Sequence, residues 1–369
     1  MKCTRILWLI IITVSVHGDF SFIVTNDMRF GDNAPMKENL RDAMGCIARK
    51  HGDTDFMISP GDNTPEKEIH QIIQDSLGCD FSWYPMVGNH EADTDSDKVY
   101  LKECVGALTG IVNSGPVHAE STMYSFDREE VHFACINVYY DGVDEFSSWK
   151  TNGVSDACYE WLKNDLETTE KEAILVFGHV PAFVLCDEDT KMEYQMDSDL
   201  GLSGGNPENR DRFWALLKRH KVIAYFCGHQ HSYYSKDFDG VYQYNAGAIS
   251  DNSASYDTYI RVVVDERTIS IEAWREYEKN QFTCKETIIH SLTDHSNKEI
   301  TGAIETPIII IGGRYQSCLN KQSHVYLLNG KAIPLIESNW GVYTKKVNIH
   351  LKNNNCASHL LVRKTTDRH

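Results

Sequence analysis

The sequence predicts an α/β fold, in which a layered domain of strands and helices is followed by a smaller β-rich region. Between residues 20 and 275, apolar runs of strand length alternate with segments whose apolar residues recur at helical spacing, and this alternation is typical of layered α/β domains. After Trp274 the helical spacing disappears, and short apolar runs are separated by turn residues such as Asn329-Gly330. We therefore expect an α/β domain at residues 19–280 and a β-rich extension or small domain at residues 285–369.

The expected strands are short runs of apolar residues. The segment 55–59 (DFMIS) is typical of a buried strand, and the segments 123–126 and 131–139 flank a turn and predict a hairpin. The complete set of strands expected in the first domain is 20–25, 55–59, 81–87, 123–126, 131–139, 173–177, 222–227, 241–245, 259–264 and 269–274. In the C-terminal region the runs 307–311, 324–328 and 347–351 predict further short strands.

The expected helices lie between these strands. In the segment 34–51, apolar residues recur at Met36, Leu40, Met44 and Ile47, which places them on one face of a helix. The same spacing predicts helices at residues 65–77, 157–169 and 211–220.

The N-terminus has the pattern of a secretory signal peptide. Lys2 and Arg5 precede an apolar run at residues 6–16, and the small residues Val16 and Gly18 stand at the −3 and −1 positions of a cleavage site. We expect residues 1–18 to be removed after Gly18, which predicts a secreted or periplasmic protein with no membrane span in the mature chain. An uncleaved anchor is the alternative, but a span usually needs about 20 apolar residues.

The charge and the cysteines limit the possible partners and the covalent structure. The net charge of −17 argues against a nonspecific nucleic-acid binder, which needs a basic surface to bind phosphates. Ten cysteines remain after removal of the signal peptide, and an even number in an exported chain allows disulfides. Cys135 and Cys227 lie in apolar runs and are equally typical of buried free thiols.

Five short polar motifs each follow an expected strand. They are Asn26-Asp27-Met28-Arg29, Gly61-Asp62-Asn63, Gly88-Asn89-His90-Glu91, Gly178-His179 and Gly228-His229-Gln230-His231. Sheets of this class place their sites at the carboxyl ends of strands, and glycine allows the chain to turn sharply before a ligand. Taken singly, each motif is typical of a turn or a helix cap. Together their carboxylates, amide and imidazoles favour a transition-metal site over a calcium site.

In this order the motifs resemble the signature of the calcineurin-like metallophosphatase superfamily, which includes the purple acid phosphatases. That signature runs Asp-x-His, Gly-Asp, Gly-Asn-His-Asp/Glu, Gly-His and Gly-His-x-His. The resemblance covers residues 20–275 and implies a four-layer α/β/β/α sandwich with a centre for two metal ions, of which Fe, Zn and Mn are the expected kinds.

The resemblance also implies a role for each matching residue. The first metal would be held by Asp27, Asp62 and His231, and the second by Asp62, Asn89, His179 and His229. His90 would lie near the substrate phosphate as an acid or a stabiliser of the transition state. The implied reaction is hydrolysis of a phosphate ester by a metal-bound hydroxide.

One position departs from the family pattern. Arg29 stands where the signature has histidine, and a guanidinium remains protonated and cannot bind a metal. Purple acid phosphatases also lack this histidine but supply a tyrosine three residues after the Gly-Asp aspartate, where this chain has Pro65. Arg29 could instead bind a phosphate oxygen in bidentate fashion, or it could form a structural salt bridge beside the acidic site.

The sequence therefore predicts an exported, metal-dependent phosphoesterase with a phosphate ester as substrate. Monoesters, diesters and nucleotides are not distinguished. The first alternative is a non-catalytic relative that binds a phosphorylated ligand, which Arg29 favours and which the retained Asp62, Asn89 and His90 oppose. A structural protein with a degenerate domain is a second alternative, but it predicts scattered ligand losses, whereas one position is lost.

Overall fold

The computed structural model describes residues 19–147, 153–187, 189, 207–249, 256–265 and 268–292, together with five short strands between residues 308 and 362. The expected signal peptide, residues 1–18, lies outside the described residues. The chain divides into two compact units, Met1–Gln316 and Ser317–His369.

The first sheet of the N-terminal unit has the strand order β14-β13-β12-β11-β1-β2-β3. Three parallel strands form one half of it: β1 (Phe20–Val24), β2 (Phe56–Ser59) and β3 (Ser82–Pro85). The antiparallel half consists of β11 (Thr258–Val264), β12 (Thr268–Glu278), β13 (Gln281–Ser291) and β14 (Ile308–Ile310).

The second sheet has the strand order β4-β5-β6-β7-β8-β10-β9. Its central strands β6 (Val131–Cys135), β7 (Ala173–Phe177), β8 (Ala224–Cys227) and β10 (Val241–Ala246) are parallel. The antiparallel strands β4 (Ile111–Ser114), β5 (Tyr124–Arg128) and β9 (Tyr233–Phe238) complete its two sides.

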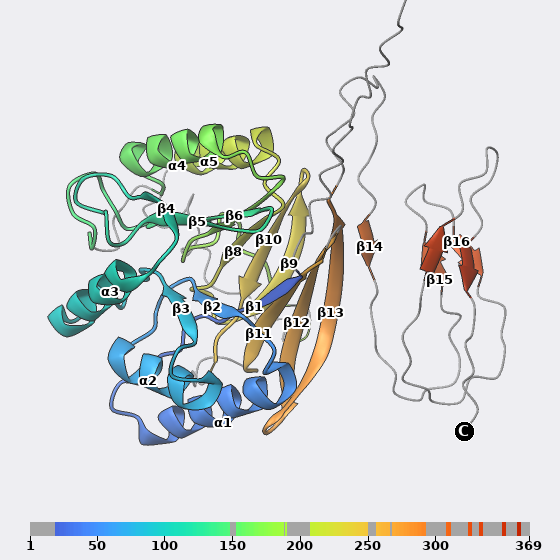
Figure 1. Cartoon of the computed structure of the whole chain (residues 1–369), viewed down its shortest axis with the longest axis horizontal. Coiled ribbons are helices and arrows are strands. Elements are labelled where there is room, and N and C mark those ends of the chain that lie inside the picture. The colour runs from blue at the N-terminus through green and yellow to red at the C-terminus, as the bar shows by residue number, and fades with distance from the viewer. Residues whose placement is uncertain are drawn as a thin grey trace, which may run out of the picture. The chain divides into compact units, whose positions relative to one another are not determined.

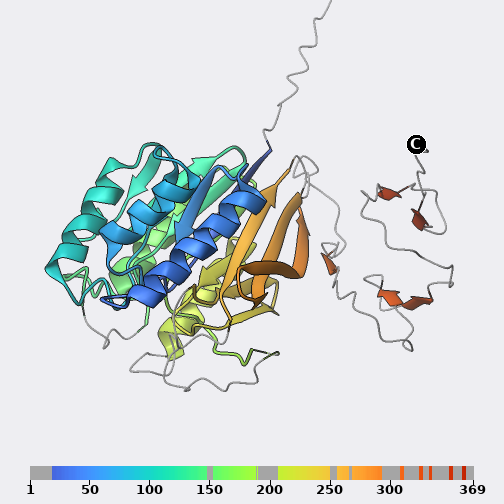
Figure 2. The same cartoon turned by 90° about the horizontal axis from the view of Figure 1, so that it is seen from below.

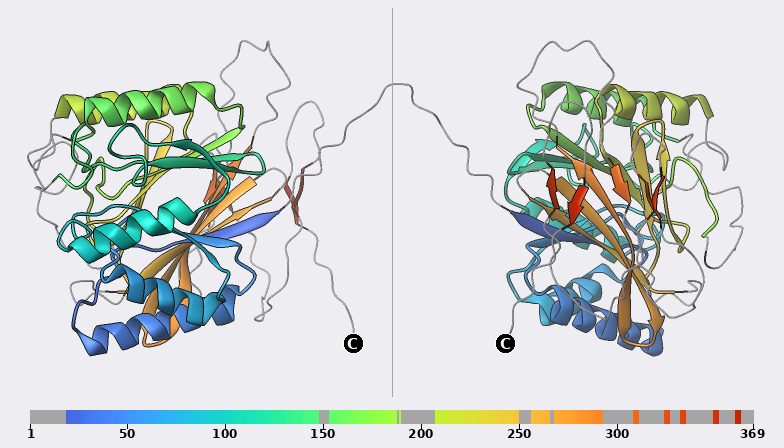
Figure 3. Two further views of the ribbon diagram at one scale, coloured as in Figure 1. Left: turned by 60° about the vertical axis from the view of Figure 1, so that its left-hand side comes forward. Right: turned by 90° about the vertical axis from the view of Figure 1, so that its right-hand side faces the viewer.

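Helices cover the outer faces of both sheets. On the first sheet lie α1 (Ala34–His51) and α2 (Glu66–Leu77), which stand in front of it in Figure 2. On the second lie α4 (Asp156–Thr168) and α5 (Pro207–Arg219), and α3 (Asp95–Ala107) packs beside α2 and β3. The order helix, sheet, sheet, helix is visible in Figure 1 and again in Figure 3, and it confirms the predicted four-layer α/β/β/α sandwich.

Aromatic side chains fill the space between the sheets. Phe22 of β1 stacks on Phe56 of β2 with ring centroids 5.0 Å apart, and it also contacts Phe133 of β6 edge-on at 5.3 Å. Because successive side chains of a strand point to opposite faces, the neighbouring Ile23 turns outward and packs in the cluster beneath α1 with Leu40. The strands β1 and β2 are therefore buried on both faces, which explains their uninterrupted apolar runs in the sequence.

The second unit contains two short antiparallel hairpins. One pairs β15 (His324–Tyr326) with β16 (Ala332–Pro334), and the other pairs β17 (Ile349–Leu351) with β18 (Leu360–Val362). These strands agree with the expected β-rich C-terminal region. The expected boundary at residues 280–285, however, falls at the start of β13, which pairs with β12 along its whole length. That strand therefore belongs to the first sheet, and the compact units divide only after Gln316.

Two further expectations concern the membrane and the cysteines. None of the helices in the described ranges is both long and apolar enough to cross a membrane. The cysteines within those same ranges are free thiols. Cys135 and Cys227 are buried, which agrees with the expectation that they are buried free thiols and not members of disulfides.

Candidate metal centre

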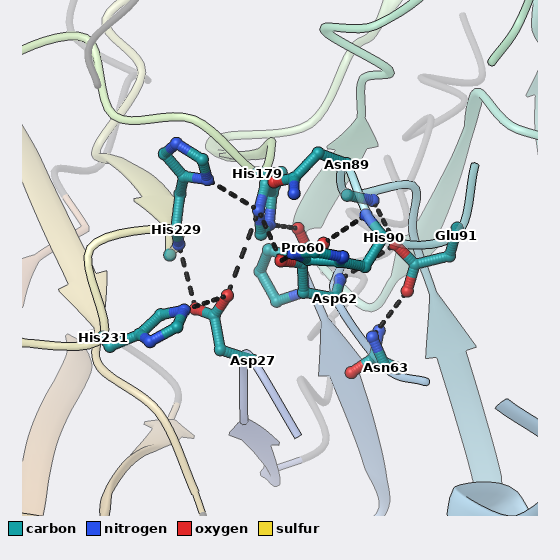
Figure 4. A network of polar contacts seen from close by, with 12 residues as sticks. Asp27, Pro60, Asp62, Asn63, Asn89, His90, Glu91, His179, His229 and His231 are labelled. Carbon is teal, nitrogen blue, oxygen red and sulfur yellow. Dashed lines mark hydrogen bonds and ion pairs between the residues drawn. The ribbon is translucent and has the colours of Figure 1, made fainter. Parts of the chain in front are cut away.

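The five polar motifs meet at one edge of the sandwich, as the close-up in Figure 4 shows. Asp27, Asp62 and the Asn89-His90 pair follow β1, β2 and β3 of the first sheet, whereas His179 and the His229/His231 pair follow β7 and β8 of the second. The structure thus brings together all of the predicted metal ligands, although they span about 200 residues of sequence. Their role as ligands remains a prediction.

The backbone at these positions is strained. Asp27, Asp62, His229 and His231 have positive φ angles of 49°, 58°, 67° and 50°. Residues other than glycine rarely adopt this conformation. Where they do, they are often found at functional sites, because the surrounding structure holds the strained backbone in place. Here each left-handed residue lies two to four positions after the end of β1, β2 or β8, in the loop that carries the candidate ligand.

Two glycines allow the loops to approach closely. A Cβ on Gly88 would lie 2.2 Å from Oδ1 of Asp62, and a Cβ on Gly228 would lie 0.9 Å from Nδ2 of Asn26. Gly228 precedes His229, whose backbone N–H donates to Oδ2 of Asp27 at 2.9 Å. The absence of a side chain at Gly228 therefore allows this contact between the β8 loop and the β1 loop.

The ligand atoms form two overlapping groups. Asp27, Asp62 and His231 form one, Asp62, His179 and His229 form the other, and within each group the ligand atoms lie within 4.8 Å of one another. Nε2 of His231 is 3.4 Å from Oδ1 of Asp27, and Nε2 of His179 is 3.5 Å from Oδ2 of Asp62. Asp62 is shared by both groups.

These donors fit transition-metal ions. Carboxylate oxygens and imidazole nitrogens suit Zn, Mn and Fe, and Oδ1 of the buried Asp27 accepts no hydrogen bond from any residue that the structure describes. Nδ1 of His179 donates to the carbonyl of Pro60 at 3.0 Å, which fixes the ring and leaves Nε2 facing the carboxylates.

The charges of the site favour a cation at its centre. Burial alone would lower the pKa of His179, but the carboxylates of Asp62 and Asp27 outweigh it and raise this pKa to about 9. Burial, followed by the charge of His179, lowers the pKa of His229 to about 3. Nε2 of His179 lies 3.2 Å from Nδ1 of His229. The two carboxylates thus stabilise positive charge where they meet, and a metal ion would supply such a charge.

Glu91 has a supporting role that the sequence motif does not reveal. Its fully buried carboxylate accepts hydrogen bonds from the backbone N–H groups of Asp62 at 3.0 Å, Asn63 at 2.5 Å and Gly88 at 2.6 Å. Burial, together with the charge of Asp62, raises its pKa to about 7. Glu91 therefore holds the β2 loop and the β3 loop at a fixed distance from each other.

The two predicted catalytic residues, His90 and Arg29, differ in their contacts with the rest of the structure. His90 is fixed at the site: its backbone N–H donates to Oδ1 of Asp62 at 2.9 Å, and Nε2 of its ring lies 3.8 Å from Oδ2 of the same aspartate. Its Nδ1 donates to Asp93 at 2.5 Å. Arg29 is half-buried, two residues after Asp27, and its side chain forms no hydrogen bond or ion pair with any described residue.

Tyr139 also reaches the site, and no sequence motif indicated it. It follows β6, and its hydroxyl donates to Oδ1 of Asn89 at 3.4 Å. Burial, followed by the charges of Asp62 and Asp27, raises the pKa of this phenol well above its ordinary value. Tyr139 is therefore protonated and acts as a hydrogen-bond donor.

Comparisons with known proteins agree with this geometry. The family model for calcineurin-like phosphoesterases matches residues 20–233, whereas none of the curated proteins matches the chain. A dimetal phosphatase from Danio rerio is 13% identical with a TM-score of 0.51, covering 74% of this chain and 99% of its own. The structure of PhoD is 10% identical with a TM-score of 0.52, covering 78% and 73%. These two structures support the fold. Because the family model covers more than half of the sequence, the protein belongs to the calcineurin-like phosphoesterase family.

Proposed function

We propose that this protein is an exported, metal-dependent phosphoesterase that hydrolyses phosphate esters at a dinuclear metal centre. The observation that carries the proposal is the pair of ligand groups that share Asp62, because a bridging carboxylate between two sets of donors is what two neighbouring cations require. In the proposed arrangement Asp27 and His231 complete the first site, and Asn89, His179 and His229 complete the second. The expected ions are Fe, Zn or Mn.

Metal ions bound there would supply Lewis acidity to the phosphoryl group and lower the pKa of a nearby water. The remaining chemistry belongs to the side chains. Asp93 accepts a hydrogen bond from Nδ1 of His90, which orients the ring with Nε2 toward the ligand cluster. From there Nε2 can donate a proton to the leaving oxygen of the ester. Arg29 can bind a phosphate oxygen, because no described carboxylate pairs with its guanidinium.

The first experiment measures metal content and hydrolysis together. The purified full-length chain is analysed for transition metals and assayed with a generic aryl phosphate, with and without a chelator. His179→Ala and His229→Ala are each expected to remove most of the metal and the activity. His220→Ala, which removes an imidazole after α5, is the matched control. Full metal content in both ligand variants would contradict the ligand assignment.

The second experiment separates catalysis from metal binding. His90→Ala should lower turnover by about 10²- to 10⁴-fold, the usual contribution of one positioned acid, and leave the metal content near that of the wild type. Unchanged turnover would remove His90 from the mechanism.

Arg29 supports a second candidate, a non-catalytic relative that binds phosphorylated ligands, because it leaves the first site with three protein ligands. In a phosphoesterase, Arg29→Ala should reduce catalytic efficiency by about 10-fold or more. In a binding protein, no added divalent metal should produce hydrolysis, and the same variant should only weaken phosphate binding. If the wild type is clearly active and Arg29→Ala does not change this activity, Arg29 takes part neither in catalysis nor in phosphate binding.

Export is part of the same proposal. The expected cleavage after Gly18 would leave Asp19 directly before β1, so the mature chain would begin where the first sheet begins. Expression in a secreting host, followed by mass spectrometry of the N-terminus, tests this point. A protein that is retained in the cells and still carries residues 1–18 would contradict it.

A further inference from the structure

We propose that Tyr139 is a positioning residue of the second metal site, where its hydroxyl holds the Asn89 side chain with Oδ1 turned toward the cation. This inference rests on the proposed function, because it concerns how one ligand of that centre is oriented.

The fold places Tyr139 at the same edge as the ligands. Beyond the ends of β6 and β7 the pairing continues for one more residue, since the N–H of Ile136 donates to the carbonyl of Phe177. The next turn is fixed by Asn137, whose buried side chain accepts from the N–H of Tyr139 at 2.9 Å and donates to the carbonyl of Glu145 at 2.7 Å. The phenol is therefore held at the edge of the sheet beside the β7 loop that carries His179.

Two proposed ligands of the second site are in its reach. The hydroxyl lies 3.4 Å from Oδ1 of Asn89, and the ring centroid lies 6.1 Å from that of His179. Both Tyr139 and Asn89 are buried. Among the described residues, the Asn89 side chain has no other hydrogen-bond partner, so this phenol alone decides which way the amide faces.

Orientation matters because the two ends of a carboxamide differ. The oxygen has two lone pairs and can accept a proton donor and a cation at the same time, whereas the NH₂ group has no lone pair to offer. If Tyr139 donates to Oδ1, one lone pair is used and the other remains for the metal. Without the hydroxyl, the amide can rotate and present its NH₂ group to the site, and every such rotation removes a ligand.

The neighbouring Tyr140 provides a matched control. Its hydroxyl shares its one proton between the carbonyls of Val117 at 2.6 Å and Gly142 at 3.0 Å, and neither of these residues is a candidate ligand. Tyr139→Phe and Tyr140→Phe therefore delete the same atom from adjacent buried residues, but only the first deletion affects Asn89.

The experiment uses the metal-free full-length chain and titrates it with Co²⁺, whose visible absorption reports the ligands of each site. Tyr139→Phe should weaken one of the two sites by about 10- to 100-fold, the usual effect of removing a partner that orients a metal ligand, and should change the visible spectrum of that site. Tyr140→Phe should match the wild type in both respects. In an Asn89→Ala background, Tyr139→Phe should cause no further loss, because the residue through which it acts is gone.

Three results would overturn the inference. The first is a folded Tyr139→Phe variant with wild-type affinity and spectrum. The second is an equal loss of affinity on adding Tyr139→Phe to Asn89→Ala, since the tyrosine would then act by another route. The third is a wild type that binds no Co²⁺, which would also remove the proposed metal centre, whereas the first two leave that centre intact.

Discussion

Gly228→Ala tests the contact between the β8 loop and the β1 loop with one added methyl group. In the structure the new Cβ would lie 0.9 Å from Nδ2 and 2.1 Å from Cγ of Asn26. Carbon atoms of this kind are not found closer than about 3 Å to another heavy atom, so the loops must move apart by about 2 Å. Asn26 is fully buried, and in a close-packed interior there is no space into which its side chain can turn.

The displacement has two consequences. Overpacking of this kind destabilises a protein by about 1–3 kcal/mol, and this loss should be visible in the metal-free chain. The shift also pulls His229 away from Asp27, whose 2.9 Å hydrogen bond joins the two loops. Because these residues belong to different ligand groups, we expect metal affinity to fall by about 10-fold or more, the loss typical of disturbed metal-site geometry.

Chemical denaturation of the chain in the presence of a chelator measures the loss of stability, and titration with Co²⁺ measures the loss of metal affinity. Gly106→Ala is the matched control, because a Cβ there meets nothing within 4 Å and α3 gains a better helix former. That control should keep wild-type metal affinity and gain up to about 1 kcal/mol. A Gly228→Ala variant with unchanged stability and unchanged affinity would refute the claim that the close approach of these loops builds the site.

Three further predictions concern residues that support the fold. Arg275→Met should destabilise the chain by about 3–5 kcal/mol in chemical denaturation, because it removes the cation that pairs with the buried carboxylate of Asp187 at 2.5 Å. The double variant with Asp187→Leu should lose less, and an equal loss would contradict this account. Burial lowers the pKa of His290 to about 4, so the unfolded chain, with an ordinary value of 6.5, takes up the proton first and stability falls as the pH falls from 6.5 to 4. In His290→Phe the free energy of unfolding should fall by about 3 kcal/mol less than in the wild type over this pH range. Identical profiles of unfolding free energy against pH for variant and wild type would contradict this prediction. Glu91→Ala leaves three backbone N–H groups unpaired at about 1–3 kcal/mol each, so both the unfolding free energy and the metal affinity should decrease; a variant that retains the wild-type metal affinity would show that Glu91 does not fix the ligand loops.

The parts of the fold that the sequence predicts are those buried on both faces. β7, with the sequence AILVF, is buried at every position, and such runs can be recognised without knowledge of their neighbours. Most of the candidate ligands are predictable for a related reason, since they follow β1, β2, β7 or β8, which are buried at every position. Elements with little buried apolar surface give no such signal. Of α3 only Asp97, Leu101 and Val105 are buried, and of β9 only Tyr233 and Tyr234 are buried. Neither element is predicted.

Contacts between distant parts of the chain were beyond the reach of the sequence patterns. The motif at Asn89 contains no indication of Tyr139, which lies 50 residues later in an apolar run, and nothing near Asp187 points to Arg275, 88 residues away. Both pairings depend on which strands become neighbours in space. The role of Glu91 could not be predicted for another reason. Its hydrogen-bond partners are backbone N–H groups, and the identities of the side chains do not indicate which backbone groups a carboxylate will meet.

The ligands come in equal parts from the two sheets, and this arrangement has a mechanical consequence. A cation held by Asp27 and His231, or by Asp62 and His179, would act as a cross-link that joins one half of the sandwich to the other. Elsewhere the halves are joined by apolar packing and by hydrogen bonds such as that of the Tyr124 hydroxyl to the carbonyl of Pro85, and coordination bonds would add a further link at this edge. At a free metal concentration 100 times the dissociation constant, such a cross-link adds about 2.7 kcal/mol to the resistance to unfolding. The metal supply would then set the free energy of unfolding of the chain, and loss of the proposed ions would weaken the sandwich first at the edge that carries the candidate ligands.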